Sequence, residues 1–294
     1  MNEPNFFIVG APKCGTTALN DYLARHPEVF MAEKEMHHFG RDLKMKDRIS
    51  LPDYLAHFRE AANRKIRGEA SVWYLFSETA AAEIQQFAPD AKIVIMLRNP
   101  VQVIHSLHSQ HLYDGNEDVF DFETAVSLDE ARKRGERLPD SVDYFELPPY
   151  RDSVLFYRQV KRYLDVFPPD QVKVVLYDDF RSHTPETVAE VFRFLGLEPI
   201  DISYKVINAN KQVRRPWLHR LLKRPPGRLQ QLVRLLLPFR PLRHWIMSQL
   251  FQQNISIQKR GEMPPALKRQ LQQYLAADIT ALSQLIRRDL SAWL

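Results

Sequence analysis

Apolar and polar positions alternate along the chain in short blocks that predict strands and helices in turn. An apolar run at 6–9 predicts a first strand, and a helical pattern follows over about 16–25. The apolar run at 92–97 predicts a second, fully buried strand. A helix that begins at Asn99-Pro100 and continues to about 111 comes directly after it.

The second half of the chain repeats this unit. Residues 172–177 predict a strand, and the following helix begins at Thr184-Pro185 and ends at Gly196. Three strand–loop–helix units predict an α/β fold of the P-loop type, with three layers and a central parallel sheet flanked by helices. Leucine and isoleucine recur at helical spacing over 267–286, which predicts an amphipathic helix that packs on the body of the protein.

Length and composition are those of a globular protein with a sizeable core. The 294 residues are expected to form one domain, 1–294, with 113–150 and 218–260 as insertions that shape access to a site or form an interface. The single cysteine excludes an internal disulfide and fits a reducing compartment. The first residues lack the basic and apolar parts of a signal peptide, and no apolar run approaches the roughly 20 residues of a membrane span. We therefore expect a cytoplasmic protein.

The net charge of +5 is unevenly distributed. Between Asp201 and Glu262 the chain has thirteen lysines and arginines and no acidic residue. Such a block favours an anionic partner, which includes nucleotide phosphates, an anionic substrate and a lipid surface. The segment 214–250 is thus a candidate for peripheral membrane contact, and packing against the body or against another subunit is the alternative. The oligomeric state is left open, and we expect no nucleic-acid partner.

The stretch GAPKCGTTAL, residues 10–19, joins the first strand to the first helix and has the composition of an anion-binding loop. The main-chain amides of Gly15, Thr16 and Thr17 would face an anion at the positive end of the helix, and Lys13 would add a full charge. A nucleoside-triphosphate loop carries its lysine directly after the second glycine, where Thr16 stands here. The pattern favours a single 5′-phosphate with a compact leaving group over a triphosphate.

This loop resembles the 5′-phosphosulfate loop of sulfotransferases that use 3′-phosphoadenosine-5′-phosphosulfate (PAPS), and it is closest to the glycan and bacterial members. The resemblance implies that Lys13–Thr17, with Cys14 among them, bind the phosphosulfate end of the donor. The stretch LRNPVQVIHS is similar to the family's 3′-phosphate element, in which Arg98 and Ser106 match the arginine and the serine. An arginine can bind a phosphate with two parallel hydrogen bonds. A 3′,5′-bisphosphorylated nucleotide needs two such anion sites on neighbouring strand ends.

A third stretch, EKEMHHF at 33–39, resembles the K-E-x-H-x-F stretch of glycan sulfotransferases, whose glutamate is the general base. Glu35 and His37 match this pattern. An acceptor hydroxyl is almost un-ionised at neutral pH, so a positioned carboxylate that takes its proton contributes about 10²–10⁴-fold. The resemblance implies that Glu35 is this base, that His37 orients it or shares the proton, and that Lys13 offsets charge on the leaving oxygen.

The stretch GEASVWY at 68–74 is similar to the G-E-K-S-x-x-Y segment that borders the cleft in this family, and its serine and tyrosine are candidate contacts. It departs from the family at Ala70, where many glycan sulfotransferases carry a lysine near the sulfate. Either Lys34 or a basic residue of 211–224 would have to supply that charge.

Two later stretches complete the resemblance. LYDDF resembles the Y-E-D block of the family, which implies that Tyr177 contacts the adenine. NKQVRRP resembles a basic loop that closes over the nucleotide, and its candidate phosphate contacts are Lys211, Arg214 and Arg215.

The resemblance implies an enzyme that moves a sulfuryl group from PAPS to a hydroxyl of a carbohydrate, a glycolipid or another small molecule, with 3′-phosphoadenosine-5′-phosphate (PAP) as product and no metal. One alternative is a P-loop kinase of a nucleotide or small metabolite, with Asp178-Asp179 binding magnesium at a strand end. Another is a non-catalytic nucleotide-binding or membrane-docked adaptor. The spacing of His105, His108 and His111 could place two of them on one helix face as metal ligands. No acidic or cysteine third ligand accompanies them, and we interpret them as helix-surface or cleft-lining residues.

Overall fold

The structure is a computed structural model of the 294-residue chain. It describes residues 3–45, 47–61, 63–139, 148–204 and 261–294, with the shorter pieces 211–213, 255–257 and the positions 235, 239, 242, 246 and 249. The chain divides into two compact units. The first consists of 1–106, 144–208 and 264–294, and the second of 107–143 and 209–263. The expected single domain stays a prediction.

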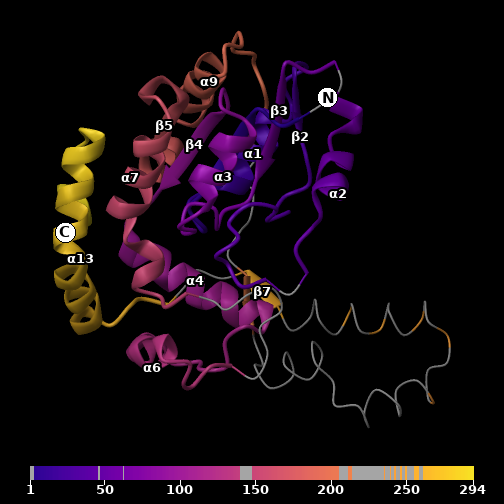
Figure 1. Ribbon diagram of the computed structural model, residues 1–294. Coiled ribbons are helices and arrows are strands. Elements are labelled where there is room, and N and C mark those ends of the chain that lie inside the picture. The colour runs from indigo at the N-terminus through magenta and orange to yellow at the C-terminus, as the bar shows by residue number, and fades with distance from the viewer. Residues whose placement is uncertain are drawn as a thin grey trace. The chain divides into compact units, whose positions relative to one another are not determined.

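A five-stranded parallel sheet forms the centre of the first unit (Figure 1). Its strands are β1 (Phe6–Gly10), β2 (Val29–Met31), β3 (Ile66–Ala70), β4 (Lys92–Leu97) and β5 (Val172–Leu176). They are arranged in the order β2-β3-β1-β4-β5, and every neighbouring pair is parallel. The three strands that the sequence predicts are confirmed as β1, β4 and β5.

Helices of the first unit follow the strands and cover the sheet. They are α1 (Thr16–Leu23), α2 (Leu51–Ala56), α3 (Ala80–Phe87), α7 (Phe156–Val166), α8 (Tyr177–Ser182), α9 (Thr184–Phe194) and α13 (Pro265–Ile286), with single 3₁₀ turns at Arg59–Ala61, Asp152–Val154, Pro169–Gln171 and Ser291–Trp293. Helix α1 packs against α9, while α7 contacts both α3 and α13. Because crossovers between parallel strands are right-handed, α1 and α3 lie on opposite faces of the sheet. The α/β three-layer prediction is therefore confirmed.

The second unit is smaller. It contains α5 (Phe122–Ser127), α6 (Asp129–Lys133) and an antiparallel pair of strands, β6 (Lys211–Val213) and β7 (Ile255–Ile257). Helix α4 (Pro100–Asp114) begins in the first unit and ends in the second. A buried ion pair of 2.7 Å joins Arg132 to Glu117 within the second unit. Among the described residues, no helix combines the length and the apolar character that crossing a membrane requires.

Two of the five strands are absent from the prediction, because β2 has only three residues, VFM, and β3 has polar residues between its apolar ones. Strand β3 reads IRGEA, and its Gly68 lies opposite Phe6 of β1. A Cβ atom at Gly68 would approach the Phe6 ring to 2.7 Å, so a glycine is needed where β2, β3 and β1 lie side by side. The helix expected over 267–286 is confirmed as α13, and its buried residues are Leu267, Leu271, Leu275, Ile279 and Leu282.

The strand register brings the loops that carry the candidate site to one edge of the sheet. Ile8 of β1 pairs with Ala70 of β3, and Gly10 with Ile95 of β4. Leu97 at the end of β4 pairs with Leu176 at the end of β5. The residues that follow β1, β3, β4 and β5 therefore leave the sheet at the same edge, where ligands of open parallel sheets bind.

Candidate active site

The anion-binding loop between β1 and α1 takes a shape that depends on positive backbone angles. Lys13 has φ 63° and Gly15 has φ 91°. The Ala11 amide donates to the Met96 carbonyl of β4 at 2.7 Å, which fixes the start of the loop to the sheet. The first amides of α1 have no partner inside the helix, so the loop presents hydrogen-bond donors at the positive helix end, as the sequence predicts.

Arg98 and Tyr177 lie against this loop from the next two strand ends. The Arg98 guanidinium donates to the main-chain carbonyl of Lys13 at 3.4 Å and stacks over the Tyr177 ring, 4.5 Å from its centroid. Its Nε donates to Gln102 on α4 at 3.0 Å. A Cβ atom at Gly15 would meet the Tyr177 ring at 3.1 Å, so the ring packs directly on the loop. Four residues that the sequence proposes as nucleotide contacts, Lys13, Gly15, Arg98 and Tyr177, are therefore neighbours.

Ser106 and Cys14 are both buried, with different consequences. Ser106 lies two turns into α4, whose start is capped by the Asn99 side chain accepting from the Val101 amide at 3.1 Å. Cys14 has a fully buried thiol that donates to the Pro12 carbonyl at 3.5 Å. Burial raises the pKa of this thiol to about 12, against the lowering influence of the nearby cations. A contact between Cys14 and a ligand would therefore have to use its main chain.

Glu35 and His37 contact each other in the loop that follows β2. His37 Nε2 lies 3.1 Å from Glu35 Oε2, and the same oxygen accepts a hydrogen bond from the Val72 amide at 3.2 Å. Burial raises the pKa of Glu35, but the hydrogen bond from His37, the charges of His37 and Lys34 and the Val72 amide together lower it below the ordinary value. His37 is buried, whereas 38% of the Glu35 side chain is exposed. The carboxylate is thus held ionised with one part open to solvent.

The backbone of this loop is strained at the two residues that the sequence proposes for proton transfer. Glu35 has φ 64° and His37 has φ 48°. Non-glycine residues rarely adopt such angles, and where they do, the surrounding contacts must stabilise them. Lys13 is a third candidate catalytic residue with this conformation, so all three lie in strained turns.

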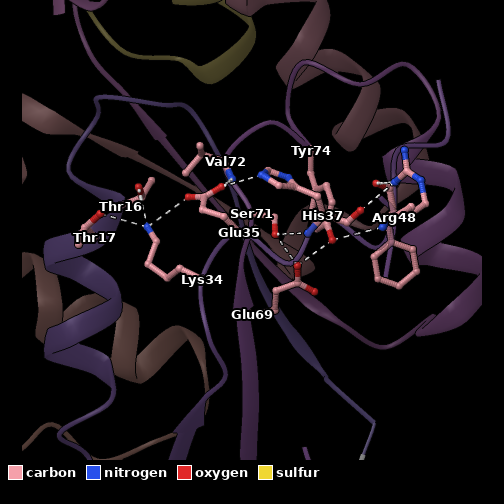
Figure 2. A network of polar contacts seen from close by, with 11 residues as sticks. Thr16, Thr17, Lys34, Glu35, His37, Arg48, Glu69, Ser71, Val72 and Tyr74 are labelled. Atoms are coloured by element: carbon pink, nitrogen blue, oxygen red, sulfur yellow. Dashed lines mark hydrogen bonds and ion pairs between the residues drawn. The ribbon is translucent and has the colours of Figure 1, made fainter. Parts of the chain in front are cut away.

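A buried carboxyl group behind the loop, Glu69 on β3, supplies part of that stabilisation (Figure 2). It accepts hydrogen bonds from Ser71 at 2.6 Å, from Tyr74 at 2.7 Å and from Tyr54. Ser71 in turn accepts from the His37 amide at 3.1 Å. Burial raises the pKa of Glu69, while its three hydroxyl donors act in the opposite direction. Ser71 and Tyr74, which the sequence predicts at the cleft, therefore belong to the hydrogen-bond network that stabilises the loop of Glu35 and His37.

Arg48 fixes the same loop from its other side (Figure 2). Its guanidinium donates to five main-chain carbonyls at 2.8–3.2 Å, those of His37, His38, Phe39, Gly40 and Leu43. A single planar group with five donors suits a tightly curved chain of this kind.

Lys34 connects the proposed base to the anion-binding loop. Its Nζ lies 3.1 Å from Thr17 Oγ1, 3.5 Å from Thr16 Oγ1 and 3.6 Å from Glu35 Oε1 (Figure 2). Burial lowers the pKa of Lys34, and the Glu35 carboxylate partly opposes that shift. Ala70, by contrast, is buried and receives the Glu35 amide on its carbonyl at 2.9 Å. Of the two sources of positive charge considered above, Lys34 is the one that the described residues bring to this place.

The acidic pair at the end of β5 is turned toward the C-terminal segment. Asp179 accepts from Arg288 at 2.7 Å, and Asp178 from the Trp293 indole at 3.3 Å. These contacts engage the carboxylates that the kinase alternative would use for magnesium, and they therefore disfavour it. His108 and His111 are buried, which excludes the helix-surface interpretation for these two, while the cleft-lining alternative stays a prediction. His108 bonds to the Val119 carbonyl at 2.8 Å.

The basic loop that the sequence predicts over the nucleotide lies mostly outside the described residues. Lys211 opens the short strand β6, but its side chain lies outside the described residues. Arg214 and Arg215 also lie outside them. These three contacts stay predictions.

Two residues that shape the site carry no role in the sequence-based expectations. Glu69 belongs to the stretch GEASVWY, and an acidic residue in a strand between buried positions could have indicated a structural carboxyl group. No sequence pattern indicates the role of Arg48, because the arginine and the loop that it binds both lie in an irregular, charged stretch.

Comparison with known proteins gives a consistent result. A family model described as "Sulfotransferase domain" matches residues 3–223. Carbohydrate sulfotransferase 15 of Rattus norvegicus is 32% identical over 67% of this chain and 44% of its own length. Heparan sulfate glucosamine 3-O-sulfotransferase 3B1 of Mus musculus is 27% identical over 67% of this chain and 47% of its own. The chain spans less than half the length of these relatives.

A solved structure is similar over almost the whole chain. The sulfotransferase from Alicyclobacillus acidocaldarius superimposes with a TM-score of 0.70 at 30% identity, covering 99% of this chain and 98% of that one. The similarity therefore extends beyond the matched region to the C-terminal helix.

Proposed function

Because this chain belongs to the family of sulfotransferase domains, we propose that it transfers a sulfuryl group from PAPS to a hydroxyl of a carbohydrate-like acceptor. The observation that carries the proposal is the meeting of two anion-binding elements at one sheet edge. Lys13 and the first turn of α1 form one, and Arg98, 3.4 Å from the Lys13 carbonyl, belongs to the other. Two anion sites this close suit a nucleotide with phosphates at both ends of its ribose.

The donor would be held as follows. Lys13 and the amides of Gly15, Thr16 and Thr17 would bind the 5′-phosphosulfate at the positive end of α1. The forked guanidinium of Arg98 suits the 3′-phosphate. In the same arrangement Ser106 would donate a hydroxyl to that phosphate, and the Tyr177 ring would pack against the adenine.

Glu35 would act as the general base. In an in-line reaction the acceptor oxygen attacks sulfur while the bond from sulfur to the bridging oxygen of PAPS breaks. Glu35 takes the acceptor proton, and the electron pair of the broken bond leaves on the 5′-phosphate of PAP. Its lowered pKa keeps Glu35 ionised at neutral pH, and its partly exposed carboxylate is accessible to an acceptor. His37 would orient Glu35 through their 3.1 Å contact.

The acceptor class rests on relatives. Proteins with 27–32% identity are described as carbohydrate and heparan sulfate sulfotransferases, which supports a sugar hydroxyl over a phenol. A glycolipid would satisfy the same chemistry. Peripheral membrane contact through 214–250 and a cytoplasmic location stay predictions, and the basic composition of that segment supports the first of them.

Calorimetric titration with PAP and with ADP tests the proposal. Both ligands carry adenosine and a 5′-phosphate, but PAP alone has the 3′-phosphate. We expect PAP to bind in the micromolar range or tighter and ADP to bind at least about 10-fold more weakly, since one charged hydrogen-bonded phosphate is worth about 1.5–3 kcal/mol. Equal affinities, or preference for ADP with magnesium, would contradict it and favour a kinase.

A further inference from the structure

Lys34 is an ammonium group held where a helix presents positive charge. Its Nζ contacts the hydroxyls of Thr17 and Thr16 in the first turn of α1, and 20% of its side chain is exposed. The N-terminal end of a helix carries a partial positive charge, and the first turn of α1 contains no acidic residue that would offset it. Lys34 adds a second positive charge at this end of α1, and the Glu35 carboxylate 3.6 Å away offsets part of it.

The arrangement becomes more favourable when an anion lies within reach of both Lys34 and the first amides of α1. The ammonium and the helix end then attract the same group from two sides. Lys34 also lies 3.6 Å from Glu35 Oε1, so the anion it favours is next to the group that would take the acceptor proton. Arg98, by contrast, contacts the loop at the Lys13 carbonyl.

We propose that Lys34 is a catalytic residue whose ammonium binds the non-bridging oxygens of the sulfuryl group as it passes from donor to acceptor. The inference rests on the proposed function, because it places the sulfur between the α1 end of the site and Glu35. In the structure the ammonium is positioned by two threonine hydroxyls on one side and by the base on the other. Lys34 therefore lies between the loop that would bind the PAPS donor and the base that would act on the acceptor.

The role of Lys34 in the step is electrostatic. The bond from the acceptor oxygen to sulfur forms, and the bond from sulfur to the bridging oxygen breaks. Glu35 receives the proton, and PAP leaves with the electron pair. Lys34 stays protonated throughout and donates hydrogen bonds to sulfuryl oxygens, which carry increased negative charge at the transition state.

The test compares two nucleotides that differ only in the sulfuryl group. Titration of wild-type protein and of Lys34→Met with PAP and with PAPS isolates contacts to that group. We expect Lys34→Met to weaken PAPS binding about 10-fold or more while PAP affinity changes less than about 2-fold. Lys34→Arg, which keeps the charge, should restore most of the PAPS affinity. Lys92→Met, which removes a lysine bonded to the Asp170 carbonyl at the start of β4, is the matched control and should change neither.

The possible results separate this inference from the proposed function. If wild-type protein binds neither nucleotide, the proposed function itself fails. If wild-type protein binds both and Lys34→Met weakens both equally, Lys34 is a ligand of the phosphate and the inference is overturned. No effect on either nucleotide also overturns it. If Lys34→Met does not fold by circular dichroism, Lys34→Gln, which keeps an amide donor to the threonines, is judged by the same ratio of affinities.

Discussion

The guanidinium of Arg98 donates a 3.4 Å hydrogen bond to the main-chain carbonyl of Lys13. One residue follows β4, and the other lies in the loop that follows β1, so the contact joins the two anion-binding elements of the site. An arginine used in this way remains able to bind a phosphate, because its planar group carries five donors. Because Arg98 belongs to the 3′-phosphate element, its loss should affect that end of the nucleotide more than the 5′ end.

Arg98→Ala should reduce affinity for PAP by about 10–100-fold, because it removes a charged, forked contact to the 3′-phosphate. ADP lacks that phosphate, and its affinity should change far less. Calorimetry with both ligands measures the difference. Gln102→Ala is the control, because it removes the 3.0 Å partner of Arg98 Nε and leaves the guanidinium in place. Equal losses for PAP and ADP would show that Arg98 supports the loop and does not bind the 3′-phosphate.

Glu35→Gln should lower kcat by about 10²–10⁴-fold and leave PAP affinity within about 2-fold, because the amide keeps the shape of the side chain but cannot take a proton. Transfer of labelled sulfate from PAPS to a panel of polysaccharide and glycolipid acceptors gives the rate. The base is active when ionised, so activity should fall as pH drops through its pKa. Since that pKa is lowered, the acid limb of the wild-type profile should lie below the ordinary glutamate pKa of 4.5. A variant with full activity would exclude Glu35 as the base.

The sequence was sufficient for those parts of the fold and the site that depend on local pattern. Apolar runs predict β1, β4 and β5, and the glycine, threonines and lysine of the first loop predict an anion site at a helix start. The position of Arg98 beside Lys13 could also be expected, because parallel strands end at the same edge.

Other parts of the structure depend on contacts between distant residues. Strand β3 is held between β1 and β2 although its own sequence, IRGEA, has weak strand character. The interaction of Arg48 with five carbonyls depends on the path of an irregular loop, which no local propensity determines. Glu69 acquires its role only when Tyr54, fifteen residues earlier, folds over the same strand.

Comparison of Tyr74→Phe with Tyr54→Phe should distinguish a role of the Glu69 network in protein stability from a role in positioning Glu35. Each removes one hydroxyl donor to the buried Glu69 carboxyl, and each should lower the free energy of unfolding by about 1–3 kcal/mol. The Tyr74 hydroxyl also accepts from the Phe39 amide at 3.2 Å, so its loss loosens the loop that holds Glu35. We expect Tyr74→Phe to reduce kcat several-fold more than Tyr54→Phe, with PAP affinity unchanged in both. Equal kcat values would show that Glu69 and its donors support the core alone.

Asp278 gives a prediction for the pH dependence of stability. This residue of α13 accepts the Tyr157 amide, in the first turn of α7, at 3.2 Å. Burial raises the pKa of Asp278 to about 6, although the Tyr157 and Phe156 amides and Arg158 act in the opposite direction. Between its ordinary pKa of 3.8 and the raised value, the folded protein binds more protons than the unfolded chain. Stability therefore falls as pH rises through that range, and the loss persists at neutral pH.

Asp278→Asn keeps an oxygen acceptor for the Tyr157 amide and removes the buried charge. One pKa unit corresponds to about 1.4 kcal/mol, and solvent screening of this partly exposed group reduces the full effect, so we expect the variant to be more stable than wild type by about 1–2 kcal/mol at pH 7.5. Urea unfolding at pH 5 and pH 7.5 should show the advantage shrinking at the lower pH. Asp90→Asn, at an exposed position, is the control and should give the same small difference at both. If Asp278→Asn is less stable than wild type at pH 7.5, the charge on Asp278 stabilises the positive end of α7 by more than its burial costs.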